Sequence, residues 1–509
     1  MEFPLIVRDF LERAETVYGD RLAVVDEPDQ PASPFDGGSI TYRRMAQLAR
    51  SQAVGLDAMG VPVGGRVAVV SHNSARLLTS FYGVSGYGRI LVPVNFRLSV
   101  PEVQYIVQHS GAEVLMVDPE LQQLLDDVEC ERKFVLGESD DEVWGSTEEP
   151  RPWAGDEHAT ATINYTSGTT ARPKGVQLTH RNNWLNATVF GWQATVSDED
   201  VYLHTLPMFH ANGWGMPFAV TGMGGKHIVL RKVDGTEILR RVEKHGVTLM
   251  CAAPAVVAAA LDAAQTWDGA IPGRDRTRIV VAGAPPPTRT IERVREELGW
   301  EFIQIYGLTE TAPLLTMSRM RSEWEDLSPT DQARKLGRAG YPAVGVRMTV
   351  DETGEALFQT NHNLEAYWEN PEATSAALAG NWFHTGDGGV IDDGALVILD
   401  RKKDVIISGG ENVSSIEVED VLMSHPSVRE VAVIGIPDEK WGELVTALVV
   451  SDGEVTEEEL IAHARASLAG YKTPKRIEFR DELARTATGK LQKFKLRQPF
   501  WAADGKQVN

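Results

Sequence analysis

The sequence contains one stretch that decides most of its interpretation: Tyr165-Thr166-Ser167-Gly168-Thr169-Thr170-Ala171-Arg172-Pro173-Lys174-Gly175, directly after the β-rich run 161–165. Its glycines and small hydroxyl residues let backbone N–H groups approach a phosphate closely, and the hydroxyls add further donors. It differs from the Walker pattern, because Lys174 precedes the last glycine instead of following it. An ordinary Ser/Thr/Gly loop is the alternative, but so specific a string favours a phosphate-binding loop.

β-rich runs and helical patterns alternate on both sides of this loop. The alternation predicts α/β layers with largely parallel sheets. We expect strands at 66–70, 90–94, 113–117, 161–165, 228–230, 278–281 and 301–306, and helices at 73–85, 100–109, 238–245 and 288–298.

The pattern changes twice towards the C-terminus. From residue 354 short strands and turns predict a small β-subdomain, and from residue 404 a compact α+β unit begins, with helices at 415–424 and 457–469 and strands at 428–435 and 444–450. The junction Asp400-Arg401-Lys402-Lys403-Asp404 is the best hinge candidate. We therefore expect a large N-terminal domain at 1–401 and a small mobile C-terminal domain at 402–509.

Composition limits the classes of protein that are possible. The chain has 509 residues, enough for two or more domains, and a formal net charge of −22, which disfavours nucleic acid and anionic membranes as partners. An anionic substrate would need a local basic patch. A candidate patch near the C-terminus contains Lys472, Lys475, Arg476, Lys490, Lys493, Lys495 and Arg497.

The cysteine content, the N-terminus and the apolar segments indicate where the protein is located. The two cysteines, Cys130 and Cys251, form no disulfide framework, which favours the reducing cytoplasm. The N-terminus does not resemble a signal peptide. The most apolar segment, 247–264, is interrupted by Pro254 and Asp262 and is too short for a membrane span.

Further strings with chemical potential follow the first one along the chain. They are Leu206-Pro207-Met208-Phe209-His210-Ala211-Asn212-Gly213-Trp214, Gly283-Ala284-Pro285, Tyr306-Gly307-Leu308-Thr309-Glu310, Trp382-Phe383-His384-Thr385-Gly386-Asp387, Ile407-Ser408-Gly409-Gly410-Glu411-Asn412 and Arg485-Thr486-Ala487-Thr488-Gly489-Lys490.

In this order, the strings resemble those of the adenylate-forming superfamily, which includes acyl-CoA synthetases, peptide-synthetase adenylation domains and beetle luciferases. The resemblance extends from Thr41-Tyr42 to Lys490. One departure is Ala171, where the family usually has glycine, although alanine is small enough to leave access to phosphate. The resemblance implies an AMP-forming acyl-CoA synthetase of the fatty acyl-CoA ligase type, which uses ATP with Mg²⁺, a carboxylic acid and coenzyme A. Family members occur as monomers and as homodimers.

The resemblance also implies the nucleotide contacts. Mg²⁺ would be held by Thr166 and Glu310, in agreement with its preference for hard oxygen ligands and few protein carboxylates. Asp387 is suited to both ribose hydroxyls, because its two oxygens accept two hydrogen bonds. The full set of implied ATP and AMP contacts is Thr166, Ser167, Gly168, Thr169, Thr170, Lys174, Gly283, Ala284, Pro285, Gln304, Tyr306, Gly307, Thr309, Asp387 and Arg401.

The implied catalytic residues are Lys490 and His210. A lysine that bridges the substrate carboxylate and the α-phosphate neutralises the charge that develops during transfer. The implied acyl pocket consists of His210, Asn212, Trp214, Gly307 and Leu308. For Trp214, a gate of an acyl tunnel and an ordinary core side chain both remain open.

Two half-reactions at one carbon require the small domain to reorient. Lys403 matches the family's pivot residue, and the implied coenzyme A tunnel is lined by Ser408, Gly409, Gly410, Glu411 and Asn412. The two glycines allow close backbone approach to the thiol arm, although a plain turn would also explain them.

Other functions fit the sequence less well. The runner-up is an adenylating enzyme that loads a carrier-protein thiol, but the run from 354 to 404 contains no inserted block of the kind that stops the thiol step in fatty acyl-AMP ligases. A nucleotide sensor is disfavoured by Lys490, Glu310 and Asp387, and nothing indicates a luciferase-like oxygenase. Gly213, Gly215 and the apolar run 216–218 favour an acid with an uncharged, elongated acyl group. A medium-chain fatty acid is the first choice, and short and aryl acids stay open.

Overall fold

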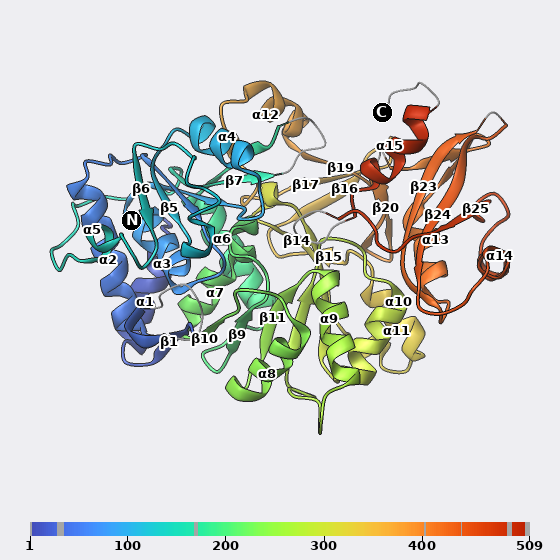
Figure 1. The fold of residues 1–509 in the computed structure, drawn as a ribbon, viewed down its shortest axis with the longest axis horizontal. Helices are drawn as coiled ribbons and strands as arrows, with labels where there is room; N and C mark the ends of the chain where they lie inside the picture. Colours follow the sequence, from blue (N-terminus) through green and yellow to red (C-terminus); the bar gives the residue numbers. More distant parts are fainter. Residues whose placement is uncertain are drawn as a thin grey trace.

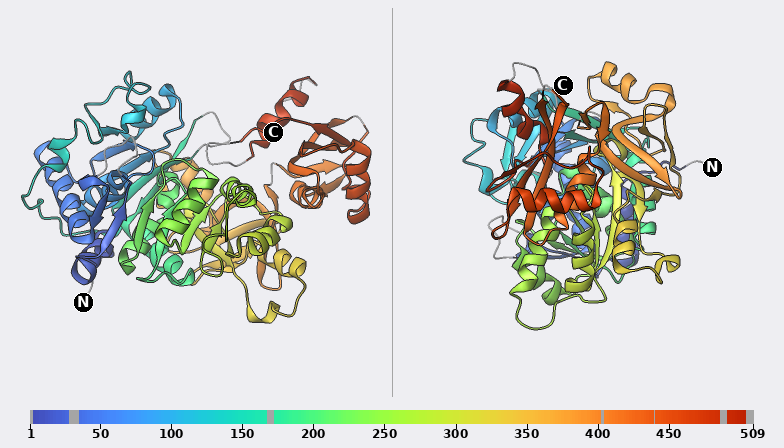
Figure 2. Two further views of the ribbon diagram at one scale, coloured as in Figure 1. Left: turned by 60° about the horizontal axis from the view of Figure 1, so that its bottom comes forward. Right: turned by 90° about the vertical axis from the view of Figure 1, so that its right-hand side faces the viewer.

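The computed structural model describes residues 3–27, 35–166, 172–401, 404–438, 440–485 and 491–503. These residues form three sheets in a large N-terminal body and a fourth sheet in a smaller C-terminal unit (Figure 1). Turned views show the C-terminal unit set to one side of the N-terminal body (Figure 2). The α/β class and the division into a large and a small domain are confirmed.

A seven-stranded sheet carries the phosphate-loop motif. Its strands β3 to β7 pair in parallel, as predicted, and β8 and β18 extend it with antiparallel pairs. Valine-rich runs suit parallel strands that are covered on both faces. In spatial order the strands are β18 (Ala366–Tyr367), β8 (Lys174–Thr179), β7 (Thr160–Thr166), β4 (Ile90–Val94), β3 (Arg66–Val70), β5 (Ala112–Val117) and β6 (Arg132–Val135).

A nine-stranded sheet carries the Tyr306 motif. Its central strands are again parallel, and β14, β15 and β2 are antiparallel additions at the edges. In spatial order the strands are β15 (Tyr341–Pro342), β14 (Leu314–Ser318), β13 (Glu301–Gly307), β12 (Arg278–Val281), β11 (Leu249–Ala252), β9 (Val201–His204), β10 (Lys226–Val229), β1 (Leu22–Val25) and β2 (Ser39–Thr41).

The largest hydrophobic core lies between these two sheets. It joins side chains such as Val67 of one sheet and Ile303 of the other through Phe190 and Phe218. The helices that carry the two phenylalanines lie between the sheets (Figure 1). The helices that contribute to this core are α1 (Arg8–Tyr18), α2 (Tyr42–Ala58), α3 (Ala75–Gly83), α5 (Asp141–Trp144), α6 (His180–Gln193) and α7 (Met216–Met223).

Other helices cover the outer faces of the two sheets. They are α4 (Val100–Ser110), α8 (Gly235–His245), α9 (Pro254–Gln265), α10 (Thr288–Arg293) and α11 (Pro329–Leu336). The helix predicted at 288–298 is α10 followed by one π-helical turn, Val294–Leu298. The apolar segment 247–264 divides into strand β11 and helix α9. Among the described residues, none of the helices is both long enough and apolar enough to cross a membrane.

The small β-subdomain is a four-stranded antiparallel sheet with helix α12 (Pro371–Ala377) beside it. Its strands are β16 (Arg347–Val350), β17 (Glu355–Gln359), β19 (Phe383–Asp392) and β20 (Ala395–Arg401). The register of β19 and β20 places Asp387 opposite Arg401.

The C-terminal unit begins directly after the β-subdomain. Its sheet contains β22 (Glu411–Val413), β21 (Ile406–Ser408), β24 (Gly442–Ser451), β23 (Val428–Asp438) and β25 (Arg476–Phe479). The helices are α13 (Ser415–Met423), α14 (Glu457–Ser467) and α15 (Lys493–Ala503). The unit contacts the large body through Asp420, which accepts hydrogen bonds from the backbone N and Oγ1 of Thr288 at 2.9 and 3.1 Å. The boundary between residues 401 and 402 stays a prediction, because 402 and 403 lie outside the described residues.

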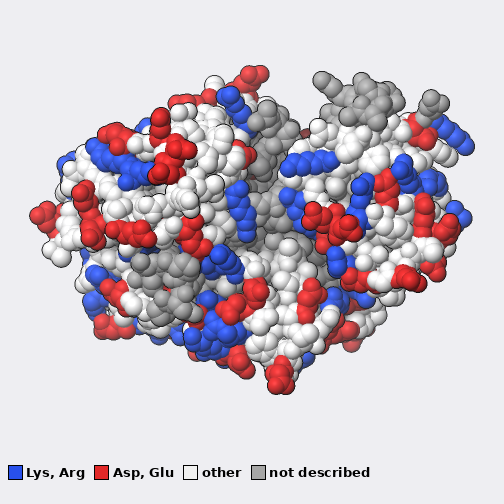
Figure 3. All heavy atoms as spheres, in the orientation of Figure 1, with Lys and Arg blue, Asp and Glu red and all other residues white. Residues whose placement is uncertain are grey.

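Four residues of the basic patch expected near the C-terminus are paired with carboxylates, and Lys490 lies outside the described residues. On the face seen in Figure 3, Lys and Arg side chains lie on both sides of the region between the two domains. The patch residues that are paired with carboxylates are Lys472 with Glu417, Lys493 with Glu419, Arg497 with Asp404 and Arg476 with Glu478.

Candidate active site

Residues predicted to bind the nucleotide come together where strand β13 meets the β-subdomain. Tyr306 lies near the end of β13, and its hydroxyl donates a hydrogen bond of 2.7 Å to Oδ2 of Asp387. Nε of Arg401 lies 3.7 Å from the other carboxylate oxygen of Asp387. Desolvation of the phenol, together with the negative charge of Asp387, raises the pKa of Tyr306 well above its ordinary value. Three residues from separate strings thus converge at one place.

Glycine is required directly after Tyr306. A Cβ added at Gly307 would lie 1.6 Å from the carbonyl oxygen of Pro313, so every larger residue would push the two backbones apart. Leu308 and Thr309 follow Gly307, and Thr309 is buried. The predicted adenine wall, 283–285, follows the end of strand β12, the neighbour of β13. Gln304 is buried within β13.

Glu310 is held from two directions. Its carboxylate Oε1 accepts a hydrogen bond of 2.9 Å from the hydroxyl of Tyr367, and its backbone carbonyl accepts one of 2.6 Å from the N–H of Leu364. Nζ of Lys174 lies 4.9 Å from the centre of the Tyr367 ring. Thr166 and Lys174 are paired in the β7–β8 ladder, so the two ends of the predicted phosphate loop lie side by side.

Tyr367 was not found by reasoning from the sequence. Its position 57 residues from Glu310 gives no local signal, and only the pairing of β18 with β8 brings the two side chains together. Burial and the Glu310 carboxylate raise the pKa of the Tyr367 phenol, so it stays a hydrogen-bond donor at neutral pH.

The carboxylates near Glu310 do not form a protein-only metal cage. Among the described residues, no group of three or more His, Cys, Asp or Glu side chains could hold a metal ion. A divalent cation at Glu310 would therefore take most of its ligands from phosphate oxygens and water, which is how Mg²⁺ is usually bound beside nucleotides. The single, oriented carboxylate of Glu310 fits that requirement.

The string with His210 forms a left-handed turn. Ala211, Asn212, Gly213, Trp214 and Gly215 have φ values of 44°, 53°, 56°, 61° and 78°. The left-handed conformation costs an L-residue about 1–2 kcal/mol, and only Gly, Asn and Asp adopt it readily. Such strain persists only where surrounding contacts hold it, and it is often found at functional sites.

Trp214 is 4% exposed and belongs to the core between the two large sheets. Its buried position agrees both with a core side chain and with the wall of an acyl pocket, so the gate stays a prediction. Met208 and Phe209 are also buried. They make this side of the predicted acid site apolar.

The predicted coenzyme A tunnel residues form the β21–β22 hairpin. Ser408 pairs with Glu411, and the turn residues Gly409 and Gly410 have φ values of 63° and 85°. The N–H of Gly409 donates to the carbonyl of Trp441 at 2.7 Å, and a Cβ at Gly409 would lie 3.0 Å from the Trp441 ring. Residues 409–412 are exposed. The turn alone explains the positive φ values, so a role in a tunnel stays a prediction.

Some predicted residues lie outside the described parts of the chain. They are Ser167, Gly168, Thr169, Thr170, Lys403 and Lys490.

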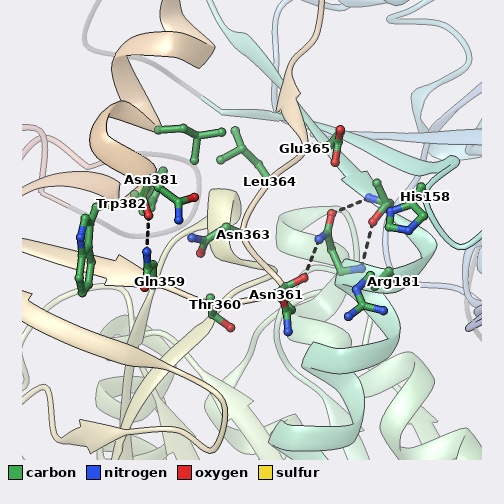
Figure 4. Close-up of a pocket in the computed structure, with 14 residues that line it drawn as sticks. His158, Arg181, Gln359, Thr360, Asn361, Asn363, Leu364, Glu365, Asn381 and Trp382 are labelled. Atoms are coloured by element: carbon green, nitrogen blue, oxygen red, sulfur yellow. Dashed lines mark hydrogen bonds between the residues drawn. The ribbon is translucent and has the colours of Figure 1, made fainter.

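A pocket of about 270 Å³ lies away from the predicted site residues, between the start of helix α6 and the segment 359–365 (Figure 4). Its lining is rich in amides, among them Asn182, Asn361, Asn363 and Asn381. It borders Leu364, whose N–H donates to the carbonyl of Glu310, and its lining includes none of the residues predicted for the acid pocket.

Comparison with known proteins agrees with this arrangement. The family model of AMP-binding enzymes matches residues 11–363, and the model of the AMP-binding enzyme C-terminal domain matches residues 417–490. The chain belongs to this family of adenylate-forming enzymes. It is an AMP-forming acid–thiol ligase whose substrates are ATP, a carboxylic acid and coenzyme A.

Individual relatives cover nearly the whole chain. The chain is similar to 4-hydroxybutyrate–CoA ligase 2 of Metallosphaera sedula, with 37% identity over 98% of this chain and 95% of that protein. It is also similar to 2-methylpropanoate–CoA ligase CCL4 of Humulus lupulus, with 36% identity over 97% and 95%. A crystal structure of the anthranilate CoA ligase AuaEII with anthranoyl-AMP has a TM-score of 0.88 and 27% identity over 99% of this chain and 100% of that one.

Proposed function

We propose that this ligase activates a monocarboxylic acid whose acyl group is uncharged and apolar, with a medium-chain fatty acid as the first candidate. Two tyrosine–carboxylate pairs carry the adenylation part of the proposal: Tyr306 on β13 with Asp387 on β19, and Tyr367 on β18 with Glu310, which follows β13. The apolar turn with Met208 and Phe209 supplies the acid side.

In the first half-reaction, a carboxylate oxygen of the acid attacks the α-phosphorus of ATP, and the bond to the bridging oxygen of pyrophosphate breaks. We assign the ribose hydroxyls to Asp387 and Arg401, with the adenine base between the Tyr306 ring and the segment 283–285. Thr309 and the loop residues 166–170 donate to the phosphates, together with Lys174. The convergence of Tyr306, Asp387 and Arg401 supports the ribose assignment, and the family resemblance implies the others.

Glu310 and Thr166 would hold Mg²⁺ with the nucleotide. The ion, when bound, neutralises phosphate charge. Tyr367 orients the Glu310 carboxylate by donating a hydrogen bond to Oε1.

Lys490 is assigned the bridging charge between the acid and the α-phosphate. In the second half-reaction, the thiol sulfur of coenzyme A attacks the acyl carbon, the C–O bond to AMP breaks, and AMP leaves with the electron pair. Because both steps occur at the same carbon, we propose that the C-terminal domain turns about Lys403 and brings residues 408–412 to the site. His210 would close the acid pocket between the steps.

A second candidate acid has four carbons. The names of two relatives, which act on 4-hydroxybutyrate and 2-methylpropanoate, favour it. The tight packing around Trp214 also suits a short acyl chain. A cytoplasmic location stays a prediction from the cysteine content; a similar plant protein is described as peroxisomal.

The test is a panel of straight-chain, branched and aryl acids assayed for AMP, pyrophosphate and thioester with coenzyme A. A maximum of kcat/KM at medium chain length supports the first candidate, and a maximum at four carbons supports the second. Release of ADP instead of AMP, or adenylate without thioester for every acid, would contradict the proposed reaction.

A further inference from the structure

The side chain of Asn212 is enclosed in a buried network of hydrogen bonds. Its Nδ2 donates to Oγ1 of Thr162 at 2.9 Å and to Oδ1 of Asn183 at 2.8 Å. Its Oδ1 accepts a hydrogen bond of 2.9 Å from Nδ2 of Asn164. None of the four side chains is more than 1% exposed. Both donors and one acceptor position of the Asn212 amide are therefore satisfied without water.

The partners of Asn212 belong to two elements that lead to the nucleotide site. Thr162 and Asn164 lie on β7, which ends at Thr166, the first residue of the phosphate loop. Asn164 also donates to the backbone carbonyl of Phe209 at 3.3 Å, so it holds the start of the turn as well as its middle. Asn183 lies in the first turn of α6 and is fixed by its own bond of 3.0 Å to the carbonyl of Thr179.

The network compensates for an unfavourable backbone. Ala211 and Trp214 have positive φ values that their side chains do not favour, and they flank Asn212, whose side chain tolerates that conformation. A second amide supports the far end of the turn: Nδ2 of Asn186 donates to the carbonyl of Trp214 at 3.4 Å. The place of the turn is thus set by buried amides of β7 and α6.

We propose that Asn212 is a positioning residue that fixes the acid-binding turn, with His210 and Trp214, in register with the strand that leads into the phosphate loop. The inference rests on the proposed function, because it takes this turn as one wall of the acid pocket. An ordinary core network would only stabilise the fold. A positioning network also sets the distance between the acid carboxylate and the α-phosphate, so its loss changes acid recognition and leaves nucleotide binding intact.

The decisive variant is Asn212→Gly. Glycine accepts the positive φ without steric cost and removes all three side-chain bonds. We expect the KM for the preferred acid to rise about tenfold, which corresponds to about 1.4 kcal/mol of lost acid binding, and the chain-length profile to flatten, because one wall of the acid pocket is no longer held in place. The KM for ATP should change by much less, because the predicted nucleotide contacts Tyr306, Asp387 and Arg401 do not belong to this network. Asn183→Ala, which leaves the turn sequence unchanged, should shift the acid KM in the same direction.

A matched control is Asn182→Ala. Asn182 is a neighbouring buried amide on α6, but its Nδ2 donates to the carbonyl of Asn361, away from the turn. This variant should lower Tm, because Asn182 also belongs to the N-terminal cap of the helix, and should leave the acid KM unchanged. It shows how far a general destabilisation of α6 changes the acid KM by itself.

Two results would overturn the inference: a native acid KM and chain-length profile in Asn212→Gly, or a parallel rise of the acid and ATP KM values that Asn182→Ala reproduces. If Asn212→Gly does not fold, the same criteria apply to Asn183→Ala. Failure of the proposed function itself is recognised separately, since the wild-type protein would then release no AMP with any acid of the panel.

Discussion

Replacing Tyr306 by phenylalanine removes a single hydroxyl from the nucleotide side of the site. The ring and its packing remain, whereas the 2.7 Å hydrogen bond to Oδ2 of Asp387 is lost. The carboxylate keeps Arg401 on its other side, at 3.7 Å. The substitution therefore tests one contact: the donor that orients the proposed ribose-binding carboxylate.

The expected magnitude follows from the chemistry of this bond. A hydrogen bond to a charged acceptor contributes about 1.5–3 kcal/mol. The Asp387 side chain is 14% exposed, so water can replace part of the lost donor, and the lower limit applies. We expect the KM for ATP to rise about tenfold, the factor that corresponds to about 1.4 kcal/mol, with little change in the KM for the acid or for coenzyme A.

The assay is pyrophosphate exchange at varied ATP, acid and Mg²⁺ concentrations. Tyr367→Phe is the matched control, because it removes an equivalent hydroxyl at 2.9 Å from the other carboxylate, Glu310. It should raise the Mg²⁺ concentration needed for the half-maximal rate, while Tyr306→Phe should not. An unchanged KM for ATP in Tyr306→Phe, or the same Mg²⁺ dependence in both variants, would refute the separate assignment of the two carboxylates.

Three other predictions concern charge, packing and pH. Lys490→Ala should slow adenylation about 10²–10³-fold and spare thioester formation from added acyl-adenylate; equal losses in both half-reactions would contradict domain alternation. Trp214→Ala should extend the accepted acids by several methylenes if the indole limits the pocket; an unaltered profile together with a loss of about 3–5 kcal/mol in urea unfolding would identify it as core. Burial raises the pKa of Asp26 from 3.8 to about 6, against the opposing hydrogen bond from the N–H of Ala75. The folded state therefore holds a proton that the unfolded state has lost between about pH 4 and 6, so this group's contribution to stability falls by about 3 kcal/mol as the pH rises through that range. In Asp26→Asn, the free energy of unfolding measured by urea denaturation should lack this fall between about pH 4 and 6. The same pH dependence of the free energy of unfolding in both proteins would contradict the prediction.

The sequence predicted the regular parts of the fold because they follow from local patterns. The valine-rich runs at 66–70 and 278–281 are central parallel strands, and the run at 288–298 is helical although its second half forms a π turn. The alternation of strands with helices is enough to specify parallel layers, since a parallel connection needs a crossover. The sequence also indicated the family, because the residues of the Thr166–Gly175 and Tyr306–Glu310 strings are adjacent in the chain and can be recognised without the structure.

The patch near the C-terminus shows where such reasoning fails. Lys493 and Arg497 are basic residues in a basic run, yet both are paired with carboxylates distant in the chain, Glu419 and Asp404. Charge pairing depends on which helices pack together, and no local count of charges contains that information.

The sequence by itself determined which residues are chemically equipped to bind a nucleotide and an acid, because glycine spacing, hydroxyls and single carboxylates are readable one string at a time. Only the tertiary structure decided how they are oriented. Tyr367 reaches Glu310 through the pairing of β18 with β8, and Asn212 is held in a left-handed turn by amides of β7 and α6. A local pattern does not favour that turn; the hydrogen bonds that stabilise it come from distant segments, and they exist only after the two large sheets and the helices between them have packed.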